Sequence, residues 1–135
     1  MGIGRTPAEL SLDSFADLTA MPVHGPLTVT VPGAVGAWHT MSERWGSNGL
    51  AASLAHAGRL ASEGVPVAPG LARDLEREKS RILADPGLRE IFAPDGRPLS
   101  AGEPLVQPRL AASLQAIADN GHDALYRGEL ARSIT

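Results

Sequence analysis

The most informative pattern of apolar and polar residues in this chain runs through residues 27–45, LTVTVPGAVGAWHTMSERW. Apolar side chains alternate with threonines over Leu27–Val31, which predicts a strand with one buried face, because successive side chains of a strand point to opposite sides. Pro32 and Gly33 are expected to end it, since proline has no N–H to donate and glycine tolerates unusual backbone angles. The rest of the chain has no convincing strand pattern. The strand therefore lacks a partner, which indicates that the chain is a piece of something larger.

From Gly33 onward the apolar residues change to a helical spacing. Large apolar side chains recur at steps of three and four residues, at Val35, Trp38, Met41 and Trp45. This spacing predicts a helix whose apolar stripe must pack against another surface, and Gly46 is expected to end it. A short helix is also predicted within residues 6–18, where Ser11 or Asp13 could cap its start.

Helical spacing continues through the rest of the chain. It predicts helices over residues 50–63, 69–84, 86–92 and 108–120, and a last helix that opens at Gly128. Gly64 and Gly121 are expected to end two of these helices, and Asp85 is expected to cap a third. The last helix reaches Thr135 without a C-terminal cap, which is a second indication of a longer parent chain.

Charged residues are densest in residues 73–81, RDLEREKSR. Asp74 and Arg77 are three residues apart, as are Glu78 and Arg81, so this stretch is interpreted as a solvated helix face with weak ion pairs. Glu78 falls close to the apolar stripe of the same helix. It is expected either at the edge of that stripe or opposite a partner.

Together these patterns predict a mainly α chain, a helical subdomain of about five helices with one short N-terminal strand. Residues 1–135 are expected to form a single helical segment, with an irregular lead-in at 1–26, the strand at 27–31, and helices and turns over 33–135. The dipeptides Asp95-Gly96 and Ala101-Gly102 predict two turns and allow a small hairpin between them.

Composition and charge exclude several classes of function. The net charge of −3 and the dispersed Lys and Arg residues argue against a nucleic-acid partner, and aromatic residues at 4% provide no stacking platform. The absence of cysteine excludes disulfides, thiolate catalysis and Cys-ligated zinc. No apolar run approaches the roughly 20 residues that span a bilayer, and the N-terminus lacks the features of a signal peptide. No membrane partner is expected, and the compartment stays open, with a periplasmic or secreted parent among the alternatives.

Candidate catalytic and metal-binding residues are scarce. The histidines are too far apart in sequence for a metal site and are interpreted as surface or capping residues: His24, His39, His56 and His122. Gly33 and Gly36 open a helix and could bind an anion, but close packing of the helix start is the favoured interpretation. There is no G-x-S-x-G nucleophile elbow. The residues therefore predict no catalytic group, metal or cofactor within the chain.

Three stretches, taken together, resemble a known family. They are TVTVPGAVGAWHTMSERWG, LAHAGRLASEGVPV and IFAPDGRPLSAGEPLVQPRLAASLQAIADNGHDALYRGELA, in this order. The chain is similar over about residues 25–135 to the interior of the large subunit of a gamma-glutamyltransferase (gamma-glutamyl transpeptidase). The most specific parts are VPG with Trp38 downstream, GRPLSAGEPLVQP, and the turn at Asn120–Gly128. Related acylases of the same superfamily share parts of this pattern.

The resemblance implies a role within an N-terminal-nucleophile hydrolase. Such a precursor cleaves itself into a large and a small subunit, and the new N-terminal Thr of the small subunit is nucleophile and, through its amine, base. It transfers a gamma-glutamyl group from glutathione or a similar donor to water or an amino acid. The nucleophile, the oxyanion hole and the four-layer αββα core would lie outside this chain. The implied partners are the remainder of the large subunit, the small subunit and a small-molecule gamma-glutamyl donor.

One substrate-binding residue is suggested by the resemblance. Family members carry an Arg in an R-E-x-A-P context, where it pairs with the donor's alpha-carboxylate, a bidentate task that suits a guanidinium group. This chain has GRTP, so Arg5 lies two positions closer to the proline than the pattern requires. The departure favours the alternative, in which Arg5 is an exposed terminal arginine.

The functional hypothesis is a structural segment of a gamma-glutamyltransferase-like enzyme, forming part of the substrate-cleft wall and inactive alone. One alternative is a free-standing helical interaction module, which should cover the strand at residues 27–31 and be monomeric. A fragment should instead expose this strand and self-associate through it. A second alternative is a segment of a related beta-lactam acylase.

Overall fold

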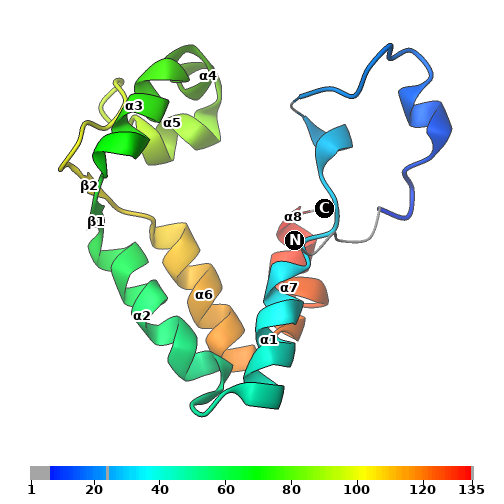
Figure 1. The fold of residues 1–135 in the computed structure, drawn as a ribbon, viewed down its shortest axis with the longest axis vertical. Coiled ribbons are helices and arrows are strands. Elements are labelled where there is room, and N and C mark those ends of the chain that lie inside the picture. The colour runs from blue at the N-terminus through cyan, green and yellow to red at the C-terminus, as the bar shows by residue number, and fades with distance from the viewer. Residues whose placement is uncertain (1–6, 24, 135) are drawn as a thin grey trace. The chain divides into compact units, whose positions relative to one another are not determined.

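The computed structural model describes residues 7–23 and 25–134, and its contacts divide the chain into two compact units, Met1–Ser47 and Asn48–Thr135. Both units consist mainly of helices and connecting loops (Figure 1). The mainly α fold class predicted from the helical spacing is therefore confirmed. The arrangement of residues 1–135 as a single segment of a larger protein stays a prediction.

The described residues of the first unit form two short 3₁₀ helices and one α-helix. These are η1 (Leu12–Phe15), η2 (Pro26–Thr28) and α1 (Ala34–Trp45). The short helix predicted within residues 6–18 is present as η1, and Ser11 precedes it with extended backbone angles and donates its N–H to Ser14 Oγ at 3.4 Å. None of the residues of η1 is buried.

The predicted strand at Leu27–Val31 is wrong for this structure. Residues 26–28 form η2, in which both the N–H and the hydroxyl of Thr28 donate to the carbonyl of Gly25, at 3.2 and 2.8 Å. No segment among the described residues pairs with residues 29–31. The physical reason is that a strand is stabilised by a neighbouring strand, and alternation of apolar residues alone cannot supply one.

Helix α1 has the predicted extent but not the predicted burial. It ends at Trp45, and the N–H of Gly46 donates to the carbonyl of Ser42 at 2.9 Å. Val35 is buried, whereas Trp38, Met41 and Trp45 are 42%, 50% and 75% exposed. The stripe of large apolar side chains is thus largely open to solvent.

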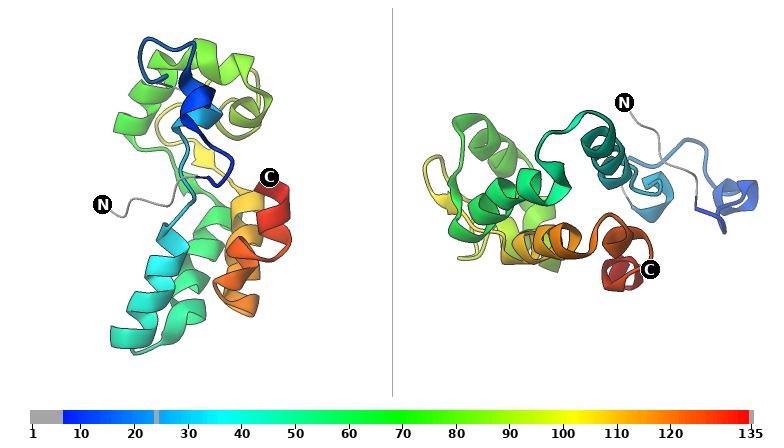
Figure 2. Two further views of the ribbon diagram at one scale, coloured as in Figure 1. Left: turned by 90° about the vertical axis from the view of Figure 1, so that its right-hand side faces the viewer. Right: turned by 90° about the horizontal axis from the view of Figure 1, so that it is seen from below.

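The second unit is a pair of helices with a lobe inserted between its two members. Helices α2 (Gly49–Glu63) and α6 (Pro108–Asn120) pack along each other in the most extensive helix contact of the chain's described part, and both views of Figure 2 show them side by side. The lobe (residues 65–105) lies at one end of this pair (Figure 1). Two short helices, α7 (Asp123–Tyr126) and α8 (Glu129–Ile134), follow α6.

The two ends of the lobe form a short antiparallel ribbon next to the helix pair. Strand β1 (Val65–Pro66) pairs with β2 (Pro104–Leu105), with Val65 opposite Leu105. Further bonds extend the ribbon, from Val67 N–H to the Glu103 carbonyl at 2.8 Å and from Gly102 N–H to the Val67 carbonyl at 2.9 Å. The residues around 95–103 turn as predicted, but β2 pairs with distant β1 and not within a local hairpin.

The lobe has an apolar core of its own. It contains α3 (Pro69–Arg77), α4 (Lys79–Ala84) and α5 (Pro86–Phe92) between the two strands. The buried cluster consists entirely of lobe residues: Val67, Leu75, Ile82, Ala93, Leu99 and Leu105. Burying a Val, Leu or Ile side chain contributes about 1.5–3 kcal/mol, so this cluster stabilises the lobe from within.

The helix predicted over residues 69–84 is divided at Glu78. Its backbone leaves helical angles there (φ −93°, ψ 10°), and α3 ends and α4 begins on either side. A continuous helix would place the Glu78 carboxylate close to the apolar stripe, and an unpaired buried charge is costly. In the structure Glu78 stays partly exposed and pairs with Arg81 at 3.5 Å. The break in the helix thus keeps the charged Glu78 side chain partly in solvent, although its sequence position falls close to the apolar stripe.

Candidate functional site

The candidate residues singled out from the sequence do not form a cluster. Arg5 and His24 lie outside the described residues. His39, His56 and His122 lie on or next to different helices, and in the described part no group of three or more His, Asp or Glu residues is placed to hold a metal ion. Among the same residues, no helix combines the length and the apolar character required to cross a membrane.

One surface feature of the second unit is a groove formed by α6, α7 and α8. Its volume is about 660 Å³, and its lining is mostly small or apolar, with polar groups at the edge. The lining residues are Ala112, Ser113, Ala116, Asn120, Asp123, Ala124, Arg127, Gly128, Glu129 and Leu130. Five of them belong to the Asn120–Gly128 turn that carries part of the family resemblance. This motif therefore shapes a surface groove.

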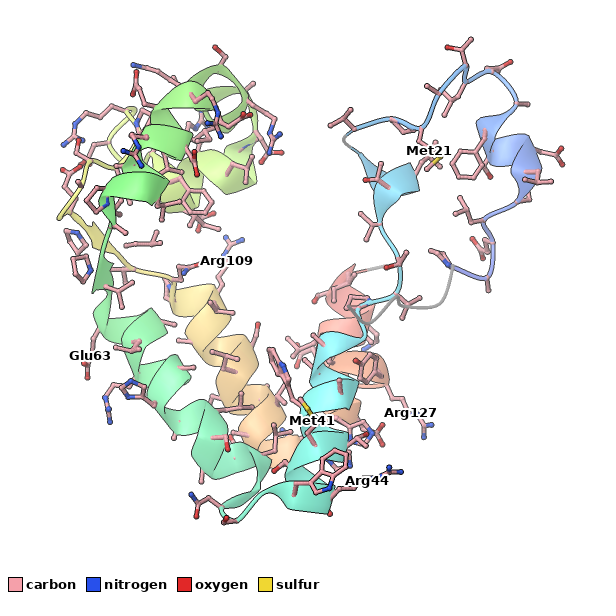
Figure 3. The ribbon with its side chains drawn as sticks, in the orientation of Figure 1. Met21, Met41, Arg44, Glu63, Arg109 and Arg127 are labelled. Atoms are coloured by element: carbon pink, nitrogen blue, oxygen red, sulfur yellow. The ribbon has the colours of Figure 1, made fainter. Side chains whose placement is uncertain are left out.

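The turn at residues 120–128 depends on close backbone approach. The N–H groups of Arg127 and Gly128 both donate to the carbonyl of Asp123, at 2.8 and 3.0 Å. A Cβ atom on Gly128 would lie 2.7 Å from the carbonyl oxygen of Ala124, so only glycine fits. Arg127 points outward from this turn and meets the Asp123 carboxylate at 3.7 Å (Figure 3). The motif thus has a local structural explanation.

A second polar cluster closes the turns between α5 and β2. The Arg97 guanidinium donates two hydrogen bonds to the Glu103 carboxylate, at 2.8 and 2.6 Å, in a bidentate arrangement. The same carboxylate accepts the backbone N–H of Ser100. Gly96 and Gly102 have positive φ angles of 79° and 86°, which place the two turns. The GRPLSAGEP motif is therefore organised by one ion pair across two glycine turns.

Arg97 and Glu103 shift each other's pKa. The hydrogen bond from Arg97, followed by the one from the Ser100 N–H, lowers the pKa of Glu103 to about 2. The hydrogen bond to Glu103 raises the pKa of Arg97 above its ordinary value. The carboxylate is already occupied by its own donors, so it is suited to holding the loop and not to accepting a proton from a substrate.

Sequence reasoning did not predict the Arg97–Glu103 pair. The signal was present, because residues of opposite charge flank the two glycine turns. Sequence spacing alone does not show that these turns bring the two side chains into bidentate contact. Two ion pairs of the charged stretch at residues 73–81 were predicted, and both are formed: Asp74–Arg77 at 2.9 Å and Glu78–Arg81 at 3.5 Å.

Several hydroxyl groups in the described residues are engaged with the backbone of their own helix or turn, whereas the buried Ser42 hydroxyl has no hydrogen-bond partner. A catalytic Ser or Thr needs a base within hydrogen-bond reach. Six hydroxyls donate instead to carbonyls three or four residues earlier: those of Thr28, Thr40, Ser53, Ser62, Ser113 and Ser133. These groups act as local helix and turn contacts.

Comparison with known proteins gives consistent results. The family model for Gamma-glutamyltranspeptidase matches residues 2–135. The chain is 42% identical over 113 residues to the acylase ACY 1 proenzyme of Pseudomonas sp. (strain SE83), covering 84% of the chain and 20% of that protein. It is 34% identical over 134 residues to the glutathione hydrolase-like YwrD proenzyme of Bacillus subtilis (strain 168), covering 98% of the chain and 26% of that protein.

A solved structure extends this likeness to three dimensions. The cephalosporin acylase from Bacillus halodurans superposes with a TM-score of 0.89 at 37% identity, covering 98% of this chain and 26% of the acylase chain. The chain spans about a fifth to a quarter of the length of these relatives.

Proposed function

Since the chain belongs to the gamma-glutamyltranspeptidase family, we propose that it is a structural segment of an enzyme that transfers a gamma-glutamyl group from glutathione or a similar donor to water or an amino acid. In this proposal the segment forms part of the wall of the substrate cleft. The reactive threonine and the groups that stabilise the transition state belong to the part of the enzyme that the chain does not span.

The family match across residues 2–135 is the observation that carries the proposal. The local geometry supports it, because two of the three most specific motifs organise turns. One positions Arg97 against Glu103, and the other brings Gly128 close to Ala124. The Ser100 hydroxyl also bonds the Glu103 carboxylate, but a carboxyl group with a pKa of about 2 is too weak a base to activate it.

The proposal expects the chain alone to have no transferase or hydrolase activity. The test incubates the purified 135-residue chain with a gamma-glutamyl anilide donor and measures release of the chromophore. An active family member serves as positive control. Chromophore release by the chain alone, retained after separation from any contaminating enzyme, would show that it carries its own active site.

The remaining parts of the large and small subunits are proposed as the partners. Apolar side chains of the first unit are open to solvent, including Leu12 at 90%, Val23 at 83% and Val29 at 58%. Large exposed apolar surfaces mark interaction sites. The remainder of a family enzyme, several times the size of this chain, is the proposed cover for them.

Light scattering separates this proposal from the free-standing interaction module. Without its partners, the segment should self-associate through the exposed apolar residues of the first unit, increasingly with concentration. Substituting Val23 and Val29 by Ser should reduce the association. A chain that stays monomeric over the whole range would favour the independent module.

Arg5 is proposed as a ligand of the donor's alpha-carboxylate, on the basis of the R-E-x-A-P resemblance alone. It is best tested in a chimera, in which residues 2–135 replace the matching segment of the glutathione hydrolase-like YwrD proenzyme of Bacillus subtilis. Arg5→Ala should raise KM for a gamma-glutamyl donor, because a bidentate pair with the carboxylate is lost. Arg89→Ala, a substitution on exposed α5, is the control. Equal kinetic effects of the two substitutions would leave Arg5 as an exposed terminal arginine.

A second candidate function is acylase activity on a beta-lactam substrate. It is favoured by the 42% identity to the acylase ACY 1 proenzyme and by the likeness to a cephalosporin acylase. The donor profile of an enzyme that contains this segment separates the two functions. Faster turnover of a gamma-glutamyl anilide supports the first, and faster turnover of an acylated cephalosporin supports the second.

A further inference from the structure

The lobe and the helix pair are stabilised by separate contacts. All buried residues of the lobe core, and the partly buried side chains packed on it, lie within residues 65–105. In the helix pair the buried residues are Leu54 and Ala61 of α2 and Leu114 and Ile117 of α6. The extensive helix contacts likewise lie either among α2, α6, α7 and α8 or among α3, α4 and α5. Each part can therefore keep its packing if the other is displaced.

The chain crosses between the two parts at two adjacent points. Gly64 leads from α2 into β1, and Val106 leads from β2 toward α6. A Cβ atom on Gly64 would lie 2.8 Å from Val106 Cγ2, so the crossings touch each other. Gly64 has a φ of 88°, in a region where glycine has more freedom than any other residue. Two crossings side by side, one of them a glycine, are suited to act as one hinge.

Apolar packing at this junction is incomplete. Leu60 in the last turn of α2, Val106 at the crossing and Leu110 in the first turn of α6 are 37%, 44% and 43% exposed. Closely packed interiors resist displacement, whereas a poorly covered junction does not. These three side chains thus leave room for the lobe to change its orientation.

One ion pair connects α5 of the lobe directly to α6. Arg109 projects from the first turn of α6 (Figure 3), and its guanidinium lies 3.1 Å from the Glu90 carboxylate. The two side chains are 84% and 55% exposed, so the pair is hydrated and weakened by salt. It can restrain the lobe without fixing it.

We propose that the lobe turns as one body relative to the α2–α6 pair about Gly64 and Val106, and that the Glu90–Arg109 ion pair is a releasable latch for this motion. The proposal concerns the chain's own conformations and does not depend on the function proposed above.

Paired spin labels test this motion directly, because the chain has no cysteine that would compete for labelling. Cysteines at exposed Ser80 and Ala52 place one label on α4 and one on α2. Cysteines at Ser80 and Ala101 place both labels within the lobe. The distance distribution of each pair is then measured by pulsed electron resonance, at low and at high salt.

Two matched substitutions identify the latch. Glu90→Gln removes the ion pair between α5 and α6, whereas Glu76→Gln removes an exposed pair of the same kind inside the lobe, with Lys79 at 3.2 Å. The distance distribution between labels at Ser80 and Ala52, which join the lobe and the helix pair, should be broader than the one between Ser80 and Ala101 within the lobe. It should broaden further with Glu90→Gln or added salt, and not with Glu76→Gln.

Three results would overturn the proposal. A lobe-to-pair distribution as narrow as the internal one would show a rigid unit. A distance distribution between lobe and helix pair that changes neither with Glu90→Gln nor with added salt would show that the Glu90–Arg109 ion pair is not a latch. Equal broadening of both distributions would show loss of structure within the lobe and not rotation of an intact body.

Discussion

Two glycines next to or within α2 have opposite roles, and this difference is testable at the residue scale. Gly64 has a φ of 88°, and a Cβ atom there would meet Val106. Gly64→Ala should destabilise the chain by about 1–3 kcal/mol through backbone strain. Gly58 lies within the helix with open space around it, so Gly58→Ala should stabilise the chain by about 0.5–1 kcal/mol.

Urea unfolding followed by circular dichroism measures both variants. The pair is internally controlled, because the same chemical change is made twice and only the backbone context differs. Equal effects of the two substitutions would contradict the backbone conformation described for Gly64.

The Glu103 carboxyl should titrate far below the ordinary value for glutamate. Hydrogen bonds from Arg97 and the Ser100 N–H lower its pKa from 4.5 to about 2. Because the folded-state pKa is lowered, the pair's contribution to stability is complete above pH 4.5 and is lost as the pH falls toward 2.

NMR titration of the Glu103 side-chain carbon measures this value. Arg97→Gln should move the pKa up toward 4.5, whereas Arg89→Gln, on the neighbouring helix, should leave it unchanged. A wild-type carboxyl that titrates near 4.5 would contradict the bidentate contact.

At the scale of elements, helix α1 is notable for its exposed tryptophans. Trp38 and Trp45 are the chain's two tryptophans, and they are 42% and 75% exposed. In single-tryptophan variants, acrylamide should quench the fluorescence of Trp45 (left by Trp38→Phe) more strongly than that of Trp38 (left by Trp45→Phe). Measurements at low protein concentration avoid self-association. Weak quenching of both residues would show that the stripe is covered in the isolated chain.

Helices were predictable where local chemistry determines their ends. Asp85 accepts the Leu88 N–H at 2.9 Å as a helix cap, and α6 covers Pro108–Asn120 as its apolar spacing and Gly121 predicted. Such features depend on residues within one or two turns of each other.

Features that depend on distant residues were not predictable in the same way. Val65 pairs with Leu105, and neither short strand has a pattern that reveals its partner. Leu27–Val31 has a strand pattern but no pairing segment among the described residues. The groove beside α6 is likewise assembled from three helices, so the sequence motif predicted its turn and not its shape.

At the scale of the whole molecule, the chain is a family segment with much apolar surface exposed and with its specific motifs used to shape turns. The lobe has its own core, and the helix pair has another set of buried residues. Stability and shape are the properties that the proposed role, a supporting part of a larger enzyme, requires of this segment.

The most direct test of this account is the activity of the chimera with the glutathione hydrolase-like YwrD proenzyme of Bacillus subtilis. The account predicts that a proenzyme carrying residues 2–135 of this chain hydrolyses a gamma-glutamyl anilide, whereas the same proenzyme lacking the segment does not. A chimera that is soluble and folded but as inactive as the deletion would contradict the claim that this chain supports the family's catalytic site.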